Sequence, residues 1–164
     1  MLLRDRYTIP DGEEAFAHAM EEGMRQASVG DLRGGLATFQ RAVAELPTKA
    51  AAFYYAGMLQ DILARSRSDF EQAARSFAHA VAAADPADPL WARSKSDAHN
   101  NLAAIRLKLG HFDQAIAAAT DAVALAPANV NAWYNRALAL DSPSDIDRIS
   151  GYPRHQRGEI SLKK

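Results

Sequence analysis

A chain of 164 residues, with 48% hydrophobic and 24% charged residues, has the length and composition of one globular domain with its own core. Its formal net charge of −1 produces no long-range field that would attract nucleic acid or an anionic membrane, so neither is expected as a partner. The chain contains no cysteine, which excludes disulfides, thiolate metal sites and cysteine nucleophiles.

No segment has the pattern of an export signal or of a membrane-spanning helix. Residues 1–7 lack the apolar core of a secretory signal. The most apolar stretch, residues 73–84, is interrupted by Arg75, Ser76 and His79, and is too short to cross a bilayer. Alanine, the best helix former, is abundant. We therefore expect a soluble, helical, cytoplasmic protein.

The first predicted helical hairpin covers residues 16–49. Two stretches with helical periodicity meet at Gly30, where glycine permits the positive φ of a helix C-cap. Pro47 cannot continue a helix and ends the second one. Gly23 and Gly35 occupy the positions at which the two helices are expected to approach each other most closely.

The second predicted hairpin covers residues 50–87. Gly57 is the small residue of its first helix and Ala73 that of its second, so these two residues are expected to face each other. Ser68 followed by Glu71 has the spacing of a capping box, which predicts that the second helix begins after Ser68.

The third predicted hairpin covers residues 96–129 and has an extension at its start. Asp88 followed by Pro89 has the pattern of an N-cap and a first helical residue. The first helix is therefore expected to begin about two turns before residue 96. Leu90 and Trp91 are then expected to project from one end of the array.

Residues 130–141 have the periodicity of one more helix, but no convincing second helix follows them. Trp133 and Leu140 on this helix are therefore expected to lie exposed unless another element covers them. Residues 142–164 are polar and basic, and are predicted to be a flexible tail.

The hairpins repeat one another in sequence. Residues 30–43 agree in type with residues 110–123 almost column by column, and residues 69–81 form a third copy. The unit of about 34 residues is that of helix–turn–helix solenoids. On these copies and on Ala132–Ala139, the chain resembles the tetratricopeptide repeat (TPR) family over residues 15–141.

The resemblance implies an all-α fold, an α-solenoid in the form of a right-handed superhelix with about three full repeats and a partial fourth. The predicted organisation is an N-terminal extension at 1–10, a TPR-like array at 11–141, with repeats at about 16–49, 50–87, 96–129 and 130–141, and a tail at 142–164.

The resemblance also implies a binding site. In TPR arrays the first helices of successive repeats line a concave groove that binds peptides. Apolar and amide side chains at these positions suit an extended peptide, or a helix with apolar anchors. Transferred position by position, the candidate groove residues are Met20, Met24, Tyr54, Tyr55, Met58, Asn101, Ala104, Asn131, Asn135 and Leu138.

Asn101 and Asn135 hold equivalent positions in consecutive repeats. A carboxamide donates and accepts hydrogen bonds, so both could bind the backbone of a peptide, as asparagine ladders do in some family members. The alternative is that the two side chains bond to their neighbours or to water. If they form a ladder, alanine at both positions weakens partner binding with little effect on folding.

One well-known binding mode of the family is not expected. TPR co-chaperones that hold the C-terminal carboxylate of heat-shock chaperones use lysine, arginine and asparagine at fixed groove positions. Here Met20 and Met24 replace a lysine and an asparagine, while Asp97 and Asn101 replace a lysine and an arginine. A carboxylate would meet an anion, so we predict that this mode is absent.

No enzyme signature is present, and neither a cofactor nor a metal is expected. The sequence lacks the GxSxG, HExxH, GxxxxGK and GxGxxG motifs. His18 with Glu21 or Glu22 has ligand-like spacing on one helix, but two groups do not form a metal site. The basic residues Arg65 and Arg67 have no interleaved aromatic residues, so an RNA site is not expected.

The predicted function is a protein-interaction module, an adaptor or assembly scaffold that binds a peptide or helix in the groove. A second hypothesis is a structural subunit that self-assembles through the exposed C-terminal end of the array, as a homo-oligomer. A third is a regulatory fragment of a larger enzyme.

Overall fold

The computed structural model describes residues 11–83 and 89–142, and all regular structure in these residues is α-helical. Seven helices follow one another: α1 (Asp11–Ser28), α2 (Leu32–Glu45), α3 (Ala50–Leu63), α4 (Arg67–Ala82), α5 (Pro89–Leu109), α6 (Phe112–Leu125) and α7 (Val130–Asp141). The predicted all-α repeat fold is confirmed. The predicted extension at 1–10 and the predicted tail at 142–164, apart from Ser142, lie outside the described residues.

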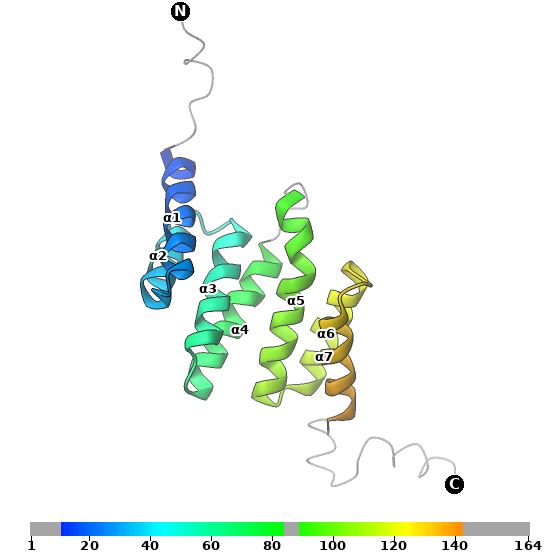
Figure 1. Ribbon diagram of the computed structural model, residues 1–164. Coiled ribbons are helices and arrows are strands. Elements are labelled where there is room, and N and C mark those ends of the chain that lie inside the picture. Colours follow the sequence, from blue (N-terminus) through cyan, green and yellow to red (C-terminus); the bar gives the residue numbers. More distant parts are fainter. Residues whose placement is uncertain (1–10, 84–88, 143–164) are drawn as a thin grey trace, which may run out of the picture.

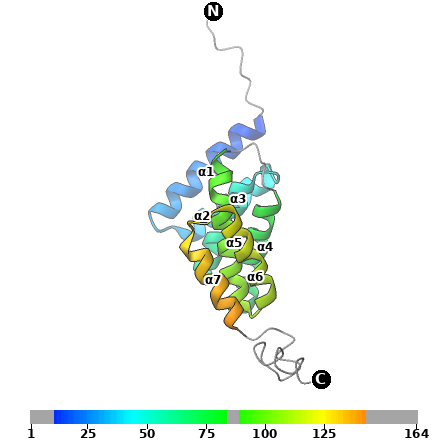
Figure 2. The ribbon, with the colours of Figure 1, turned by 90° about the vertical axis from the view of Figure 1, so that its right-hand side faces the viewer.

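The helices pack as hairpins that stack side by side (Figure 1). α1 packs on α2, α3 on α4 and α5 on α6, and each hairpin also contacts the next one. The helices α1, α3, α5 and α7 follow one another across the front of Figure 1, with α2, α4 and α6 behind them. Figure 2, seen from the α7 end, shows α7 beside α5 and α6.

Two glycines end first helices as the sequence predicts. Gly30 and Gly110 have φ angles of 87° and 76°, the left-handed region in which other residues are strained. After Gly30, the side chain of Asp31 caps α2 by accepting a hydrogen bond from the backbone N–H of Gly34 at 2.9 Å. The tight turn between paired helices therefore depends on the missing side chain of the glycine.

The capping box of α4 lies two residues earlier than predicted. Ser66, and not Ser68, is the N-cap, and its partner is Asp69, and not Glu71. The Asp69 carboxylate accepts the backbone N–H groups of Arg65 and Ser66, each at 2.8 Å, and these bonds lower the pKa of Asp69. The sequence pattern gives the capping role to Glu71. In the structure the shorter side chain of Asp69 turns back and accepts hydrogen bonds from these two N–H groups, so Asp69 has that role.

The early start of α5 is confirmed, because the helix begins at Pro89, ahead of the repeat frame at residue 96. Pro89 suits this position, since the first residue of a helix needs no N–H partner within the helix. The predicted N-cap, Asp88, and the predicted projection of Leu90 and Trp91 lie outside the described residues and side chains.

The core is made of rings that fit against small residues on the neighbouring helix. A Cβ atom added to Gly23 would lie 2.7 Å from the Phe39 ring, and one added to Gly35 would lie 3.1 Å from the carbonyl oxygen of Gly23. A Cβ atom added to Gly57 would lie 3.2 Å from the Phe77 ring, so the atoms nearest to this position belong to Phe77, while the sequence predicts Ala73 there.

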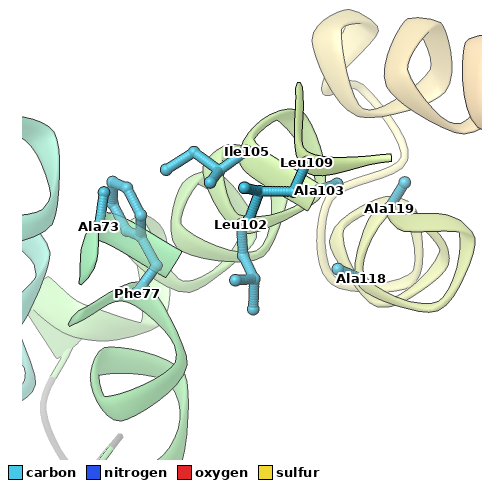
Figure 3. Packing of buried hydrophobic residues seen from close by; sticks show 8 residues of the cluster. All are labelled: Ala73, Phe77, Leu102, Ala103, Ile105, Leu109, Ala118 and Ala119. Carbon is cyan, nitrogen blue, oxygen red and sulfur yellow. The ribbon is translucent and has the colours of Figure 1, made fainter. Parts of the chain in front are cut away.

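Figure 3 shows how the cluster continues through α4, α5 and α6. Phe77 lies against the α5 side chains, and two alanines of α6 close the other side of α5. Ile105 and Phe77 are among the largest side chains that are almost fully buried. The members of this cluster are Ala73, Phe77, Leu102, Ala103, Ile105, Leu109, Ala118 and Ala119.

The last helix buries only one side. Ala132 and Ala139 of α7 are fully buried, whereas Trp133 is 46% exposed and Leu140 is 43% exposed. Ala137 is also exposed, although the residues at its position in earlier repeats, among them Gly57, are buried. Within the described residues α7 is therefore half of a repeat, and its expected exposure is confirmed.

Replacing Phe39 with alanine is expected to lower the free energy of unfolding by about 3–5 kcal/mol, because a ring that is 1% exposed leaves a cavity. Urea unfolding followed by circular dichroism measures the change. Tyr134→Ala is the control, since that ring is 66% exposed and its loss should cost less than about 0.5 kcal/mol. Equal losses for the two variants would contradict the assignment of Phe39 to the core.

Candidate functional site

The candidate groove residues lie on α1, α3, α5 and α7, the helices that adjoin one another across Figure 1. Equivalent repeat positions bring them into rows: Met24, Met58, Ala104 and Leu138 form one row, and Tyr55, Asn101 and Asn135 another. We call the surface that these helices form with the candidate residues the groove face.

Met20 is predicted to be a groove residue, but in the structure it does not belong to the groove face. It is 8% exposed and packs in the cluster with Phe39, Ala42 and Leu59. A methionine at this position fills the space between α1, α2 and α3, so it supports the fold and offers little surface to a partner. Met24, one turn further along α1, is 44% exposed.

The two tyrosines of α3 are half-buried and connect the groove face to the core. The Tyr55 ring stacks on Phe39 with centroids 5.3 Å apart, and the Tyr54 ring meets Phe77 edge-on at 5.8 Å. Burial and the nearby Asp97 carboxylate raise the pKa of Tyr54. Met58 is half-buried beside the same core. Only parts of these three side chains are therefore available to a partner.

Asn101 and Asn135 each bond to the preceding first helix. The Asn135 side chain donates a hydrogen bond of 2.8 Å to the Oδ1 atom of Asn100, which is 9% exposed. The side chains of Asn101 and Tyr54 are hydrogen-bonded to each other. These contacts correspond to the alternative reading, in which the two asparagines bond to neighbouring side chains. They connect α3 to α5 and α5 to α7. The ladder stays a prediction.

Three candidate residues, Ala104, Asn135 and Leu138, line one hollow between α5 and α7. Its volume is about 410 Å³, and Leu107, Lys108, Phe112 and Ser142 complete the wall. The wall is mostly apolar with one amide and one ammonium group, as in a site that takes an apolar side chain. Sequence reasoning missed Leu107 and Lys108, although both lie one turn after Ala104 on the same helix.

Lys108 is engaged within the protein. Its Nζ atom lies 2.6 Å from Oδ1 of Asp61 on α3 and 5.0 Å from the centre of the Phe70 ring. Both contacts cross from α5 to the preceding hairpin. The positive charge at the rim of the hollow is therefore already paired with a carboxylate.

A polar cluster at the other end of the face was also missed. Asn129 caps α7 by accepting the backbone N–H of Ala132 at 3.2 Å. Its amide group donates to the Ser96 hydroxyl at 3.0 Å and to Asp97 at 3.2 Å. In the sequence, only the position of Asn129 directly before a predicted helix could have indicated that it caps α7. The remaining candidate, Asn131, is exposed nearby.

The described residues bring together no group of three or more histidine, aspartate or glutamate side chains that could hold a metal ion. His18, Glu21 and Glu22 accordingly form no such group. None of the described helices has the length and apolar character required to span a membrane.

The sequence of residues 96–129 matches the model of the tetratricopeptide repeat family. These are the residues assigned to the third repeat, in α5 and α6. The TPR pattern that was recognised from the sequence is thus confirmed. A comparison with curated protein sequences finds no match.

Solved structures with the same fold include MamA, with a TM-score of 0.65 and 18% identity over 77% of this chain and 63% of that one. The second TPR domain of human RPAP3, in complex with the HSP70 peptide SGPTIEEVD, has a TM-score of 0.64 and 16% identity over 78% of this chain and 97% of that one. A mutant O-GlcNAc transferase of Thermobaculum terrenum has a TM-score of 0.62 and 19% identity over 80% of this chain and 23% of that one.

These similarities establish the fold: the chain is an all-α array of TPR-type helical hairpins. The chain spans less than two thirds of the length of MamA and less than a quarter of that of the transferase. Because fewer than one fifth of the aligned residues are identical, these similarities show only that the helices are arranged in the same way.

Replacing Asn135 with alanine is expected to lower the free energy of unfolding by about 1–3 kcal/mol, because the buried amide oxygen of Asn100 loses its donor. This replaces the expectation that changing Asn135 has little effect on folding. Asn131→Ala is the matched control, an exposed asparagine on the same helix. Urea unfolding compares the variants, and equal stability of the two would show that the Asn135–Asn100 bond is not important for folding.

Proposed function

We propose that this protein is a protein-interaction module whose groove face binds a segment of another protein, as an adaptor or assembly scaffold. The observation that carries the proposal is the mostly apolar hollow of about 410 Å³ on this face, lined by three of the residues selected from the sequence. An apolar hollow with a few polar groups at its rim suits a peptide side chain.

The similar structures support this proposal at the level of the module. The RPAP3 domain was solved with a bound peptide, and its fold extends over 78% of this chain. The proposal includes the absence of catalysis, because the sequence carries none of the GxSxG, HExxH, GxxxxGK and GxGxxG motifs. The cytoplasmic location stays a prediction.

A partner is expected to use Leu138, which is 44% exposed and lines the hollow. Peptides selected from a displayed library against the whole protein provide the probe. Leu138→Glu should weaken their binding by about tenfold or more, since a charge replaces an apolar contact that costs about 1.4 kcal/mol or more to lose. Isothermal titration calorimetry measures the affinities.

Leu125→Glu on α6 is the matched control, because Leu125 is 47% exposed and does not line the hollow. It should leave the affinity unchanged. A library that yields no binder, or binders that tolerate Leu138→Glu as well as Leu125→Glu, would remove the groove face as the binding site.

Self-association through α7 is a second candidate function, favoured by the exposure of Val130 (76%), Trp133 (46%) and Tyr134 (66%) on one helix. Apolar side chains in this number on one surface are typical of interfaces. If it occurs, the mass from light scattering rises with protein concentration, and Trp133→Glu abolishes the rise. A monomer at all concentrations would remove this candidate.

The regulatory fragment of a larger enzyme is a third possibility. Its support is that the transferase with the same helical arrangement is a much longer chain, of which the aligned part is 23%. This reading is compatible with the first, since a regulatory array also works by binding a protein segment.

A further inference from the structure

We propose that the groove face selects a positively charged segment of another protein, one that carries lysine or arginine next to apolar side chains. The inference rests on the proposed function, because it assigns the chemistry of the partner that binds the same face. It follows from how the structure distributes charge between two layers of helices. The first layer consists of α1, α3, α5 and α7, and the second layer consists of α2, α4 and α6.

Acidic side chains outnumber basic ones on the groove face. Asp97 lies beside Tyr54 and accepts a hydrogen bond from Asn129, and Asp61 reaches across to Lys108. Glu21 is exposed at the repeat position of Asn101 and Asn135, while Asp141 is exposed at the position of Leu107, which lines the hollow. Among the described residues at the repeat positions of Asp97, Asn101, Ala104, Leu107 and Lys108, the acidic groups are Glu21, Asp61, Asp97 and Asp141, and the basic group is Lys108.

The other cations described on these helices lie away from those positions or are paired: Arg25 of α1 forms an ion pair with Glu22 at 2.7 Å, and Lys95 of α5 lies near His99. Arg106 of α5 donates a hydrogen bond to the carbonyl oxygen of Gln114 on α6 at 3.1 Å. Arg136 of α7 donates to the Thr120 hydroxyl on α6 at 3.2 Å. These two guanidinium groups therefore point into the second layer of helices, and neither can reach a segment bound on the groove face.

Lys108 does not provide an anion site either. Its ammonium group is 2.6 Å from the Asp61 carboxylate, so the net charge that this pair presents to a bound ligand is close to zero. An acidic peptide would have to break the pair and would still meet Asp97 and Asp141. A cationic peptide meets these carboxylates directly and leaves the pair intact.

Charge alone does not complete the chemistry of the partner. The hollow beside Lys108 is walled by Ala104, Leu107, Phe112 and Leu138, which leaves an apolar side chain as its best occupant. The segment is therefore amphipathic: an apolar side chain enters the hollow, and lysine or arginine side chains lie over the acidic groups. This is the opposite charge from the peptide bound to the RPAP3 domain, SGPTIEEVD.

Two synthetic peptides with the same apolar residues test the inference. One is the acidic sequence above, and the other has lysine in place of both glutamates and the aspartate. Both are amidated, so that the terminus adds no charge. At low salt the lysine peptide is expected to bind the whole protein about three- to tenfold more tightly, since exposed ion pairs contribute modestly. The difference should shrink towards one at about 0.5 M salt.

Asp97→Lys should remove most of the preference for the lysine peptide. Glu45→Lys is the matched control, because it makes the same change in net charge at an exposed residue of α2, in the other layer. Glu21→Lys provides a second variant of the groove face in case the loss of the Asp97–Asn129 bond disturbs folding. Equal binding of the two peptides, tighter binding of the acidic one, or equal effects of Asp97→Lys and Glu45→Lys would overturn the inference.

Residues 154–164 of this chain contain four arginine and lysine side chains and one glutamate, so they carry the same chemistry. A variant with glutamine at Arg154, Arg157, Lys163 and Lys164 separates the two sources. If the lysine peptide binds this variant but not the unmodified protein, residues 154–164 of the chain itself occupy the groove face. That outcome overturns the assignment of this face to a segment of another protein.

This test is separate from that of the proposed function. Selected peptides that depend on Leu138, together with no preference for the lysine peptide, would refute only the charge inference. A failure of the library to give any binder at the groove face would refute the proposed function itself.

Discussion

The contact between a glycine on one helix and an aromatic ring on the next sets the spacing of the first two hairpins. The Phe39 ring occupies the space that a side chain on Gly23 would need, and the Phe77 ring does the same beside Gly57. An added methyl group would force a shift of packed backbone and rings, which typically costs about 1–3 kcal/mol. The distance between the paired helices of these two hairpins, and hence the position of their part of the groove face, depends on these contacts.

Polar contacts then join one hairpin to the next along the groove face. Asn135 bonds to Asn100, Asn101 to Tyr54, and Lys108 to Asp61. Each pair connects neighbouring first helices, which fixes how successive hairpins face each other. The same pairs engage Asn101, Asn135 and the Lys108 ammonium group within the protein, while the apolar side chains and the carboxylates of Glu21 and Asp141 remain exposed to a partner.

The two surfaces that α7 offers differ in character. Leu138 faces a hollow whose other walls come from α5 and the start of α6. Trp133 and Leu140 are exposed, whereas the residues at their positions in the two preceding repeats are half-buried or buried. One helix thus contributes to a mostly apolar hollow on one side and presents exposed apolar side chains on another, and these two surfaces are suited to different partners.

The sequence by itself determined the helical hairpins, their order and the ends at Gly30, Gly110 and Pro89, because these depend on residues a few positions apart. The tertiary structure decided which side chains remain accessible. Met20 fits a groove position by repeat register, yet α2 and α3 bury it. The bond from Asn135 to Asn100 joins residues 35 positions apart, and the segregation of acidic and basic groups depends on the layer each side chain faces. No local pattern contains these distances, because they arise only when the hairpins pack.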